Sequence, residues 1–286
     1  MHVRSIGICG SDVHLLETGS PLECIAGHEV AGVLDDGTPV AVEPAVPCNE
    51  CASCRAGEYN LCQLGAVGTL GIGRNGGMAD KLRIPEKCLV YLPSNLDVRD
   101  ACLIEPLAVA VHGMSRADLD VGDRVAVVGG GTIGLCAVAV AKAGRAAAGL
   151  YARYEHQMAA GNLLGAERID APYDLVVEAA GTDKAIKQAV KLCRPKGRIL
   201  ILGTHWNGLS FPQMAVMMKE ITVNFSYMYA ANGTVRDFDV AAMLLAAHPE
   251  IAEALITHRF PLAEVKSAFS VARDRKSGAI KVVLEP

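Results

Sequence analysis

The sequence lacks the features that mark nucleic-acid-binding and disordered chains. Its 286 residues carry 27 basic and 31 acidic side chains, a net charge of −4, and neither sign collects into a block. Binding to nucleic acid or to an anionic membrane surface is therefore disfavoured. There is no internal repeat or low-complexity tract, and 51% hydrophobic against 20% charged residues provides a sizeable core and excludes global disorder.

Targeting and membrane-spanning patterns are also missing. Residues 1–7 show no basic head leading into a long apolar run, so we expect no secretory signal. The most apolar window, residues 124–142, holds four glycines and divides into a strand, a turn and a helix, which disfavours a membrane span. We expect a soluble, cytoplasmic protein.

Two regions of the chain differ in composition and in hydrophobic pattern. Residues 1–115 are rich in Gly, Pro and Cys, with short β-type runs at 30–34, 40–43 and 81–84, which favours an irregular, mostly β domain. From Asp123 onward apolar runs (124–128, 175–178, 198–202) alternate with helical stretches (133–143, 184–193, 212–219), which predicts βαβ units and a parallel sheet. We place this domain at residues 116–255 and expect residues 256–286 to return to the first domain, with a strand at 277–284.

Ten cysteines are present, and four of them are bunched as Cys48, Cys51, Cys54 and Cys62. In a chain of this size without a signal peptide, bunched cysteines are more often metal ligands than disulfides. Four thiolates can close a tetrahedral shell around zinc and leave no open position for substrate. The spacing predicts a structural zinc site; the alternative is four unrelated thiols.

A glycine-rich motif follows the apolar run at 124–128. Gly129, Gly131 and Gly134 match G-x-G-x-x-G, with Thr132 and Ile133 between them, and the motif opens a helix of small residues. In this context the first glycine permits a tight turn, the second lets the backbone approach a pyrophosphate, and the third allows close helix–strand packing. We therefore predict a dinucleotide site.

The end of the next strand bears on the choice of nicotinamide cofactor. An NAD site usually places an acidic residue there, but this position holds Ala152, followed by Arg153. An arginine can pair bidentately with a 2′-phosphate, and His156 can add to that pocket. The pattern favours NADP over NAD; the alternative is an arginine that stacks on adenine.

Further motifs make the chain resemble the zinc-dependent medium-chain dehydrogenases, nearest the sorbitol and threonine dehydrogenase branch. They are residues 7–14 (Gly-Ile-Cys-Gly-Ser-Asp-Val-His), 27–29 (Gly-His-Glu), 105–112, 174–181 and 195–203, in the family's order together with the cysteine cluster and the glycine motif. The resemblance implies an α/β protein with a GroES-like β domain and a Rossmann domain, a doubly wound parallel sheet. It also implies an active site in the cleft between the two domains.

The same resemblance assigns a catalytic zinc site, which needs about three protein ligands and an open position. Cys9 and His28 correspond to the family's thiolate and imidazole ligands. Glu29 is an auxiliary carboxylate able to approach the metal. Glu105, which precedes a proline as in the sorbitol and threonine branch, is the third site residue, bound directly or through water. The alternative for Glu105 is a helix N-terminal carboxylate favoured by the helix dipole.

A proton path and a reaction follow from the resemblance. Ser11 contacts the substrate hydroxyl and starts a relay that ends at His14, while Asp12 orients the ligand histidine. The expected reaction transfers a hydride between NADP(H) and a small secondary alcohol, polyol or ketone, with two zinc ions per chain. The mixed polar and aromatic residues 224–229 suit such a substrate. We expect a homodimer or homotetramer.

The chain departs from the family pattern in length. Only eight residues precede Cys9, the stretch from Gly32 to Pro44 is short, and the link from Ile169 to Asp174 is abbreviated. The catalytic domain is thus N-terminally shortened, either as a compact variant with compensating contacts or because the start site lies downstream. The rival function is a catalytically impaired NADP-binding paralogue. A zinc-free quinone-reductase relative is disfavoured by the two cysteine-containing sites.

Overall fold

The structure, a computed structural model, describes residues 1–19, 23–167 and 172–286. Within them the chain divides into two units, Met1–Ala108 with Tyr229–Pro286, and Val109–Met228. In these described ranges no helix is long and apolar enough to cross a membrane.

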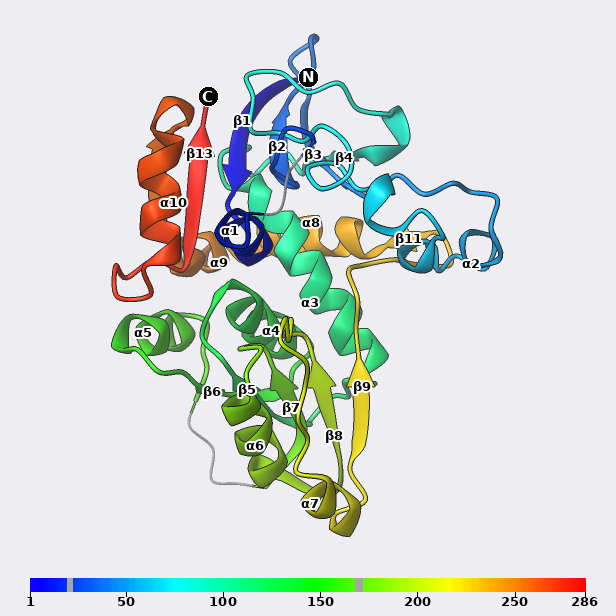
Figure 1. The fold of residues 1–286 in the computed structure, drawn as a ribbon, viewed down its shortest axis with the longest axis vertical. Coiled ribbons are helices and arrows are strands. Elements are labelled where there is room, and N and C mark those ends of the chain that lie inside the picture. Colours follow the sequence, from blue (N-terminus) through cyan, green and yellow to red (C-terminus); the bar gives the residue numbers. More distant parts are fainter. Residues whose placement is uncertain (20–22, 168–171) are drawn as a thin grey trace. The chain divides into compact units, whose positions relative to one another are not determined.

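The first unit is built on a six-stranded sheet, and α1 (Gly10–Glu17) follows its first strand directly (Figure 1). In spatial order the strands are β12 (Ile256–Pro261), β13 (Lys281–Glu285), β1 (His2–Gly7), β2 (Glu29–Val33), β3 (Pro39–Val42) and β4 (Leu89–Tyr91). All neighbours are antiparallel except β12 and β13. Alternate apolar side chains such as Ile6, Val30 and Leu284 form its core, against which α10 (Val265–Arg273) packs.

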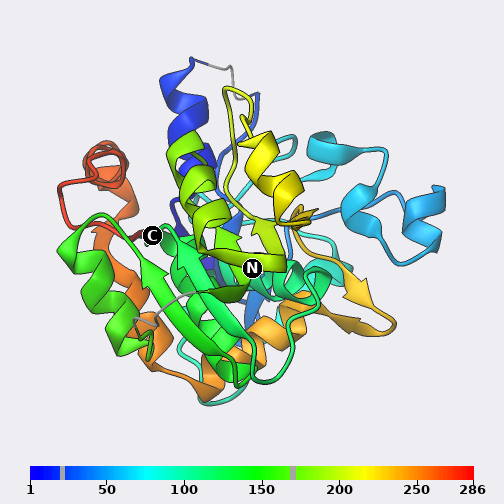
Figure 2. The same cartoon turned by 90° about the horizontal axis from the view of Figure 1, so that it is seen from below.

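The rest of this unit consists of short elements. They are the helices α2 (Ala52–Arg55), α8 (Asp237–Ala247) and α9 (Glu250–Leu255), the first half of α3 (Ile104–Arg116), the 3-10 turns η1 (Tyr59–Leu61), η2 (Gly65–Gly68), η3 (Glu86–Cys88), η4 (Ala101–Leu103) and η5 (Leu262–Glu264), and the hairpin β10 (Ala231–Asn232) with β11 (Val235–Arg236). The segment carrying α2 and η1 extends sideways from the sheet of its own unit (Figure 2). We call residues 47–68 the cysteine lobe.

The short stretch between Gly32 and Pro44 forms a tight turn between two strands. A tight turn joins β2 directly to β3, with N–H to carbonyl hydrogen bonds from Leu34 to Thr38 and from Gly37 to Leu34, each of 2.9 Å.

The prediction of a strand at residues 81–84 is wrong, because Lys81 forms only an isolated bridge with His2. Residues 80–82 pair with the start of β1, but β13 occupies the same edge from Ile6 onward, so this pairing cannot extend.

The second unit is a parallel sheet of five strands with the order β6 (Ala147–Tyr151), β5 (Arg124–Val128), β7 (Tyr173–Glu178), β8 (Cys193–Ile201) and β9 (Thr222–Phe225). The helices between them are α4 (Thr132–Ala143), α5 (Glu155–Leu163), α6 (Asp183–Leu192) and α7 (Gln213–Met218). The middles of the central strands (125–128, 175–177 and 199–201) are apolar and buried, because both faces of a parallel sheet are covered. The two sheets confirm the predicted α/β class with a β domain and a doubly wound parallel sheet.

The strand order reverses at β5, whose successor β6 lies on one side and β7 on the other. Ligands of doubly wound sheets bind at the carboxyl ends of strands at such a point. The full Rossmann order has a further strand beyond the second one, whereas in the described residues β6 is the edge. The abbreviated link at 169–174 includes residues 169–171, which lie outside the described part of the chain.

Candidate functional site

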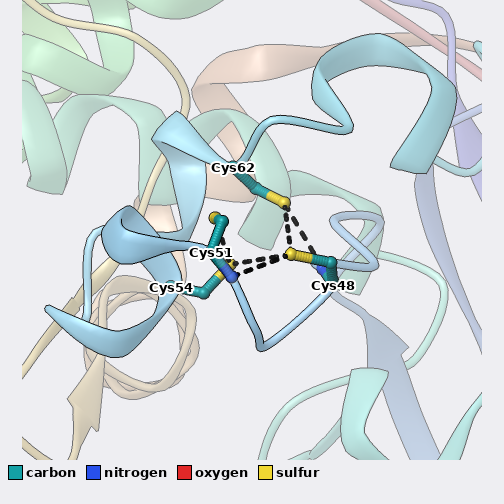
Figure 3. Close-up of side chains that lie close together, drawn as sticks. All are labelled: Cys48, Cys51, Cys54 and Cys62. Atoms are coloured by element: carbon teal, nitrogen blue, oxygen red, sulfur yellow. Dashed lines mark hydrogen bonds between the residues drawn. The ribbon is translucent and has the colours of Figure 1, made fainter.

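The cysteine lobe brings its four thiols together (Figure 3). The Sγ–Sγ distances are 3.4 Å for Cys51 and Cys54, 3.5 Å for Cys48 and Cys62, and 3.9 Å for Cys48 and Cys54. Tetrahedral zinc with Zn–S bonds of about 2.3 Å places its sulfurs about 3.8 Å apart. The donor set and its spacing therefore fit a closed zinc shell.

Backbone N–H groups already support thiolate charge in this lobe. Hydrogen bonds from the N–H groups of Cys54 and Gln63 lower the pKa of the Cys51 thiol to about 6. The N–H groups of Cys48 and Leu64 likewise lower the pKa of Cys62. Metal binding requires deprotonated thiols, so these bonds prepare the lobe for a cation.

A polar network connects the lobe to the rest of its unit. The Tyr59 hydroxyl donates to Glu43, and Arg236 forms a 3.2 Å ion pair with the same carboxylate. Burial raises the pKa of Glu43 to about 6 although both partners oppose this shift. The network links β3, the lobe and β11, so the position of the lobe depends on more than a metal.

We expect Cys54→Ser to lower the melting temperature by about 5–10 °C. The lobe has few buried apolar side chains, so a bound metal would contribute much of its order. Each kcal/mol lost shifts the midpoint by about 2–4 °C in a chain of this size. Calorimetry with zinc analysis measures both effects. Cys24→Ser, which removes a thiol outside the lobe, is the control; an unchanged melting temperature with all zinc retained in Cys54→Ser contradicts the assignment.

A second group of possible ligands lies where β1 ends and β2 begins. The ligand atoms of Cys9, His28 and Glu29 lie within 4.8 Å of one another, with His28 and Glu29 buried. Cys9 caps α1 just after β1, and Gly27, with φ of +96°, turns the chain into His28. A Cβ on Gly7 would lie 1.9 Å from the Glu29 carboxylate, so the glycine makes room for that side chain.

Asp12 lies behind this group. One of its oxygens accepts the N–H of Cys9 at 3.0 Å, and the other is 3.6 Å from Nδ1 of His28. Neither Nδ1 nor that second oxygen has a hydrogen-bond partner. Burial lowers the pKa of His28, but the charges of Cys9, Asp12 and Glu105 outweigh it and raise this pKa well above its ordinary value. A concentration of negative groups around a buried imidazole fits a bound cation.

Glu105 lies on the first turn of α3 and is buried, but it is not part of the 4.8 Å group. Burial raises its pKa to about 7, against the opposing effect of His28 and with the support of Glu29. The carboxylate is thus close enough to interact electrostatically with the group. A position next to the ligands, rather than among them, suits contact through water.

Ser11 and His14 both lie on α1, three residues apart, and therefore on one face of that helix. Both side chains are partly exposed, whereas Asp12 between them is buried. A hydroxyl and an imidazole so placed lead from the Cys9 end of the helix towards its solvent-exposed end.

Sequence reasoning missed Lys281, which the structure places against Glu29. Its Nζ lies 2.7 and 2.6 Å from the two carboxylate oxygens. Burial disfavours the ammonium charge, but Glu29 and Cys9 outweigh it and raise the pKa of Lys281 above its ordinary value. The available signal was a charged residue opening the apolar run Lys-Val-Val-Leu at 281–284.

The glycine motif forms the turn between β5 and α4. Gly129 has φ of +118°, which other residues rarely adopt, and a Cβ on Gly134 would lie 1.9 Å from the Gly129 carbonyl. A Cβ on Gly131 would meet nothing within 4 Å, so the space before the helix is open. Thr132 and Ile133 begin α4, whose N-terminal N–H groups suit a pyrophosphate.

The predicted phosphate-selecting residues follow β6. Ala152 lies beside the glycine turn, because a Cβ on Gly130 would lie 2.6 Å from that of Ala152. The exposed Arg153 guanidinium lies 5.4 Å from the ring centre of Tyr154, and Tyr154 stacks on His156 at 5.5 Å. Nε2 of His156 is buried without a hydrogen-bond partner. These residues fit an anionic ligand at the strand end.

Comparison with known proteins confirms the predicted GroES-like plus Rossmann class. Residues 1–94 match the alcohol dehydrogenase GroES-like domain family, and residues 99–285 match the glucose dehydrogenase C-terminus family. L-galactonate-5-dehydrogenase of Escherichia coli strain K12 is 31% identical over 93% of this chain and 85% of its own length.

Solved structures extend the comparison to cofactors. A Sinorhizobium meliloti 1021 protein described as a zinc-binding dehydrogenase, solved with NADP bound, shares 28% identity and a TM-score of 0.86 over 100% of this chain and 91% of its own. An alcohol dehydrogenase from Escherichia coli CFT073, complexed with NADH, shares 26% identity and a TM-score of 0.87 over 100% and 90%. One of these two structures thus holds NADP and the other NADH.

Proposed function

The chain belongs to the zinc-dependent medium-chain dehydrogenases of the sorbitol-dehydrogenase-like branch, and on that premise we propose that it interconverts a small secondary alcohol or polyol and its ketone with NADP(H). The group of Cys9, His28 and Glu29 carries the proposal, because a thiolate, an imidazole and a carboxylate within reach of one ion are ligand types that catalytic zinc uses. L-galactonate-5-dehydrogenase, by its name, acts on a polyhydroxylated substrate, which supports this substrate class.

We assign two zinc ions per chain. The four cysteines of the lobe would hold a structural ion, while Cys9, His28 and Glu29 would hold a catalytic ion, with Glu105 in contact through water. When bound, the catalytic ion supplies Lewis acidity, which stabilises negative charge on the substrate oxygen. Asp12, whose oxygen lies 3.6 Å from Nδ1 of His28, would orient the imidazole for binding.

Ser11 and His14 conduct the proton in this proposal. The Ser11 hydroxyl accepts the proton of the substrate alcohol and passes one on towards His14, which releases it to solvent. Their common face on α1 supports the path. The cofactor, when bound, supplies the hydride chemistry, and the turn at Gly129–Gly134 together with Arg153 and His156 would bind and orient it.

Turnover of polyols and secondary alcohols with NADP⁺ and with NAD⁺, followed by the absorbance of the reduced nicotinamide, tests the proposal. We expect activity with NADP⁺ and two zinc ions per chain in elemental analysis. One zinc ion and no turnover across the panel would instead support the impaired, NADP-binding paralogue. The homodimer or homotetramer stays a prediction, which sedimentation measures directly.

A further inference from the structure

Lys281 is a buried cation that no step of the proposed mechanism uses. Its side chain is 2% exposed, and its Nζ donates to both oxygens of Glu29 and, at 3.0 Å, to the carbonyl of Ile8. An ammonium group has three N–H donors. These three contacts saturate it, so both its position and that of the Glu29 carboxylate are restrained.

The contacts join the two segments that carry the metal site. Ile8 directly precedes Cys9, and Glu29 directly follows His28. Lys281 reaches both from β13, which pairs with β1 through Ile6↔Leu284 and Gly7↔Val283. The lysine therefore controls a carboxylate whose ligand atom belongs to the same 4.8 Å group as those of Cys9 and His28.

On the basis of the proposed function, we propose that Lys281 is a positioning residue that restrains Glu29 and weakens the bond of its carboxylate to the catalytic zinc. A carboxylate that accepts charge-assisted hydrogen bonds on both oxygens is held in place and has less electron density to give to a metal. Held in this way, Glu29 would compete less strongly than a free carboxylate for a position on the ion.

A purely structural ion pair makes a different prediction. Burying two charges is costly before their attraction is counted, and removing one partner usually destabilises the site around the other. Loss of Lys281 would then lower zinc affinity and activity together. If Lys281 weakens the Glu29 bond, its loss raises zinc affinity while activity falls.

The test is Lys281→Met, made in the full-length protein. We expect the catalytic site to bind Zn²⁺ about tenfold more tightly in competition with a chromophoric chelator, since one charge-assisted hydrogen bond is worth about that factor. We expect kcat to fall at least about tenfold, by the same reasoning. In the Co²⁺-substituted protein, the d–d absorption bands should shift in the way that stronger coordination by a carboxylate produces. Unchanged or weaker Zn²⁺ binding overturns the proposal.

Further variants keep the test decisive. Lys281→Gln removes the charge but keeps a hydrogen-bond donor, and it should change Zn²⁺ affinity in the same direction if Lys281→Met fails to fold. In a Glu29→Gln background, loss of Lys281 should have no further effect on Zn²⁺ affinity; an equal gain there overturns the proposal.

Lys219→Met is the matched control. Lys219 donates to the carbonyls of Val190, Lys191 and Cys193 in the other unit, so its loss should leave Zn²⁺ binding unchanged. The unsubstituted protein separates the two levels of the argument. If it lacks a second zinc ion or turnover, the proposed function fails; if it has both, the variants judge Lys281 alone.

Discussion

His28→Ala should reduce kcat/KM by about a thousandfold or more, while cofactor binding is retained. Lewis-acid stabilisation by a metal is worth several kcal/mol, and about 1.4 kcal/mol corresponds to each tenfold change in rate. The nicotinamide cofactor is expected on the second unit, whose glycine turn contains no residue of this group. Steady-state kinetics, with calorimetric titration of NADP⁺, measures the two effects separately.

The control for this variant is His248→Ala, which removes a histidine whose side chain is 43% exposed and paired with Glu250. It should leave the rate unchanged. Zinc analysis of His28→Ala should show one ion per chain, because the cysteine lobe is intact. Substantial turnover in His28→Ala would rule out the proposed metal-dependent mechanism, and loss of both ions would show that the variant is misfolded.

The second large effect should be on the preference for NADP over NAD. We expect the unaltered protein to bind NADP about ten- to a hundredfold more tightly than NAD, the value of one charge-assisted hydrogen bond to the 2′-phosphate. Arg153→Ala should remove most of this preference. Ala152→Asp should reverse this preference, because a carboxylate beside the glycine turn accepts hydrogen bonds from the ribose hydroxyls and repels a phosphate. Titration of both cofactors into the three proteins measures the ratio.

Lys187→Ala serves as the control, since it removes one positive charge from an exposed position on α6 of the same unit. Its NADP to NAD ratio should stay at that of the unaltered protein. Equal binding of the two cofactors by the unaltered protein would mean that Arg153 stacks on adenine or is solvated, and does not pair with the 2′-phosphate.

Patterns confined to a short stretch of sequence were sufficient for much of this protein. The expected run at 124–128 coincides with β5, and the helix expected at 133–143 coincides with α4 apart from its first residue. These elements are predictable because fully apolar strands and glycine turns carry their own backbone preferences. The run at 81–84 failed for the opposite reason, since pairing there depends on which edge of β1 is available.

The candidate sites also differ in how far a local pattern predicts them. The four cysteines lie within 15 residues, Cys48 to Cys62, so their spacing alone determines that a short loop can close around one ion. The identity of Ala152 and Arg153 is likewise a local property of a strand end. By itself the sequence thus determined the family, and it predicted the ligand types and the cofactor turn.

Only the tertiary structure decided which groups surround Glu29. Lys281 stands 252 residues away in the chain, and it reaches this carboxylate because β13 pairs with β1. The exclusion of Glu105 from the 4.8 Å group likewise depends on how α3 packs. Contacts of this kind follow from the register and packing of distant elements, which no local pattern of hydrophobic and polar residues specifies.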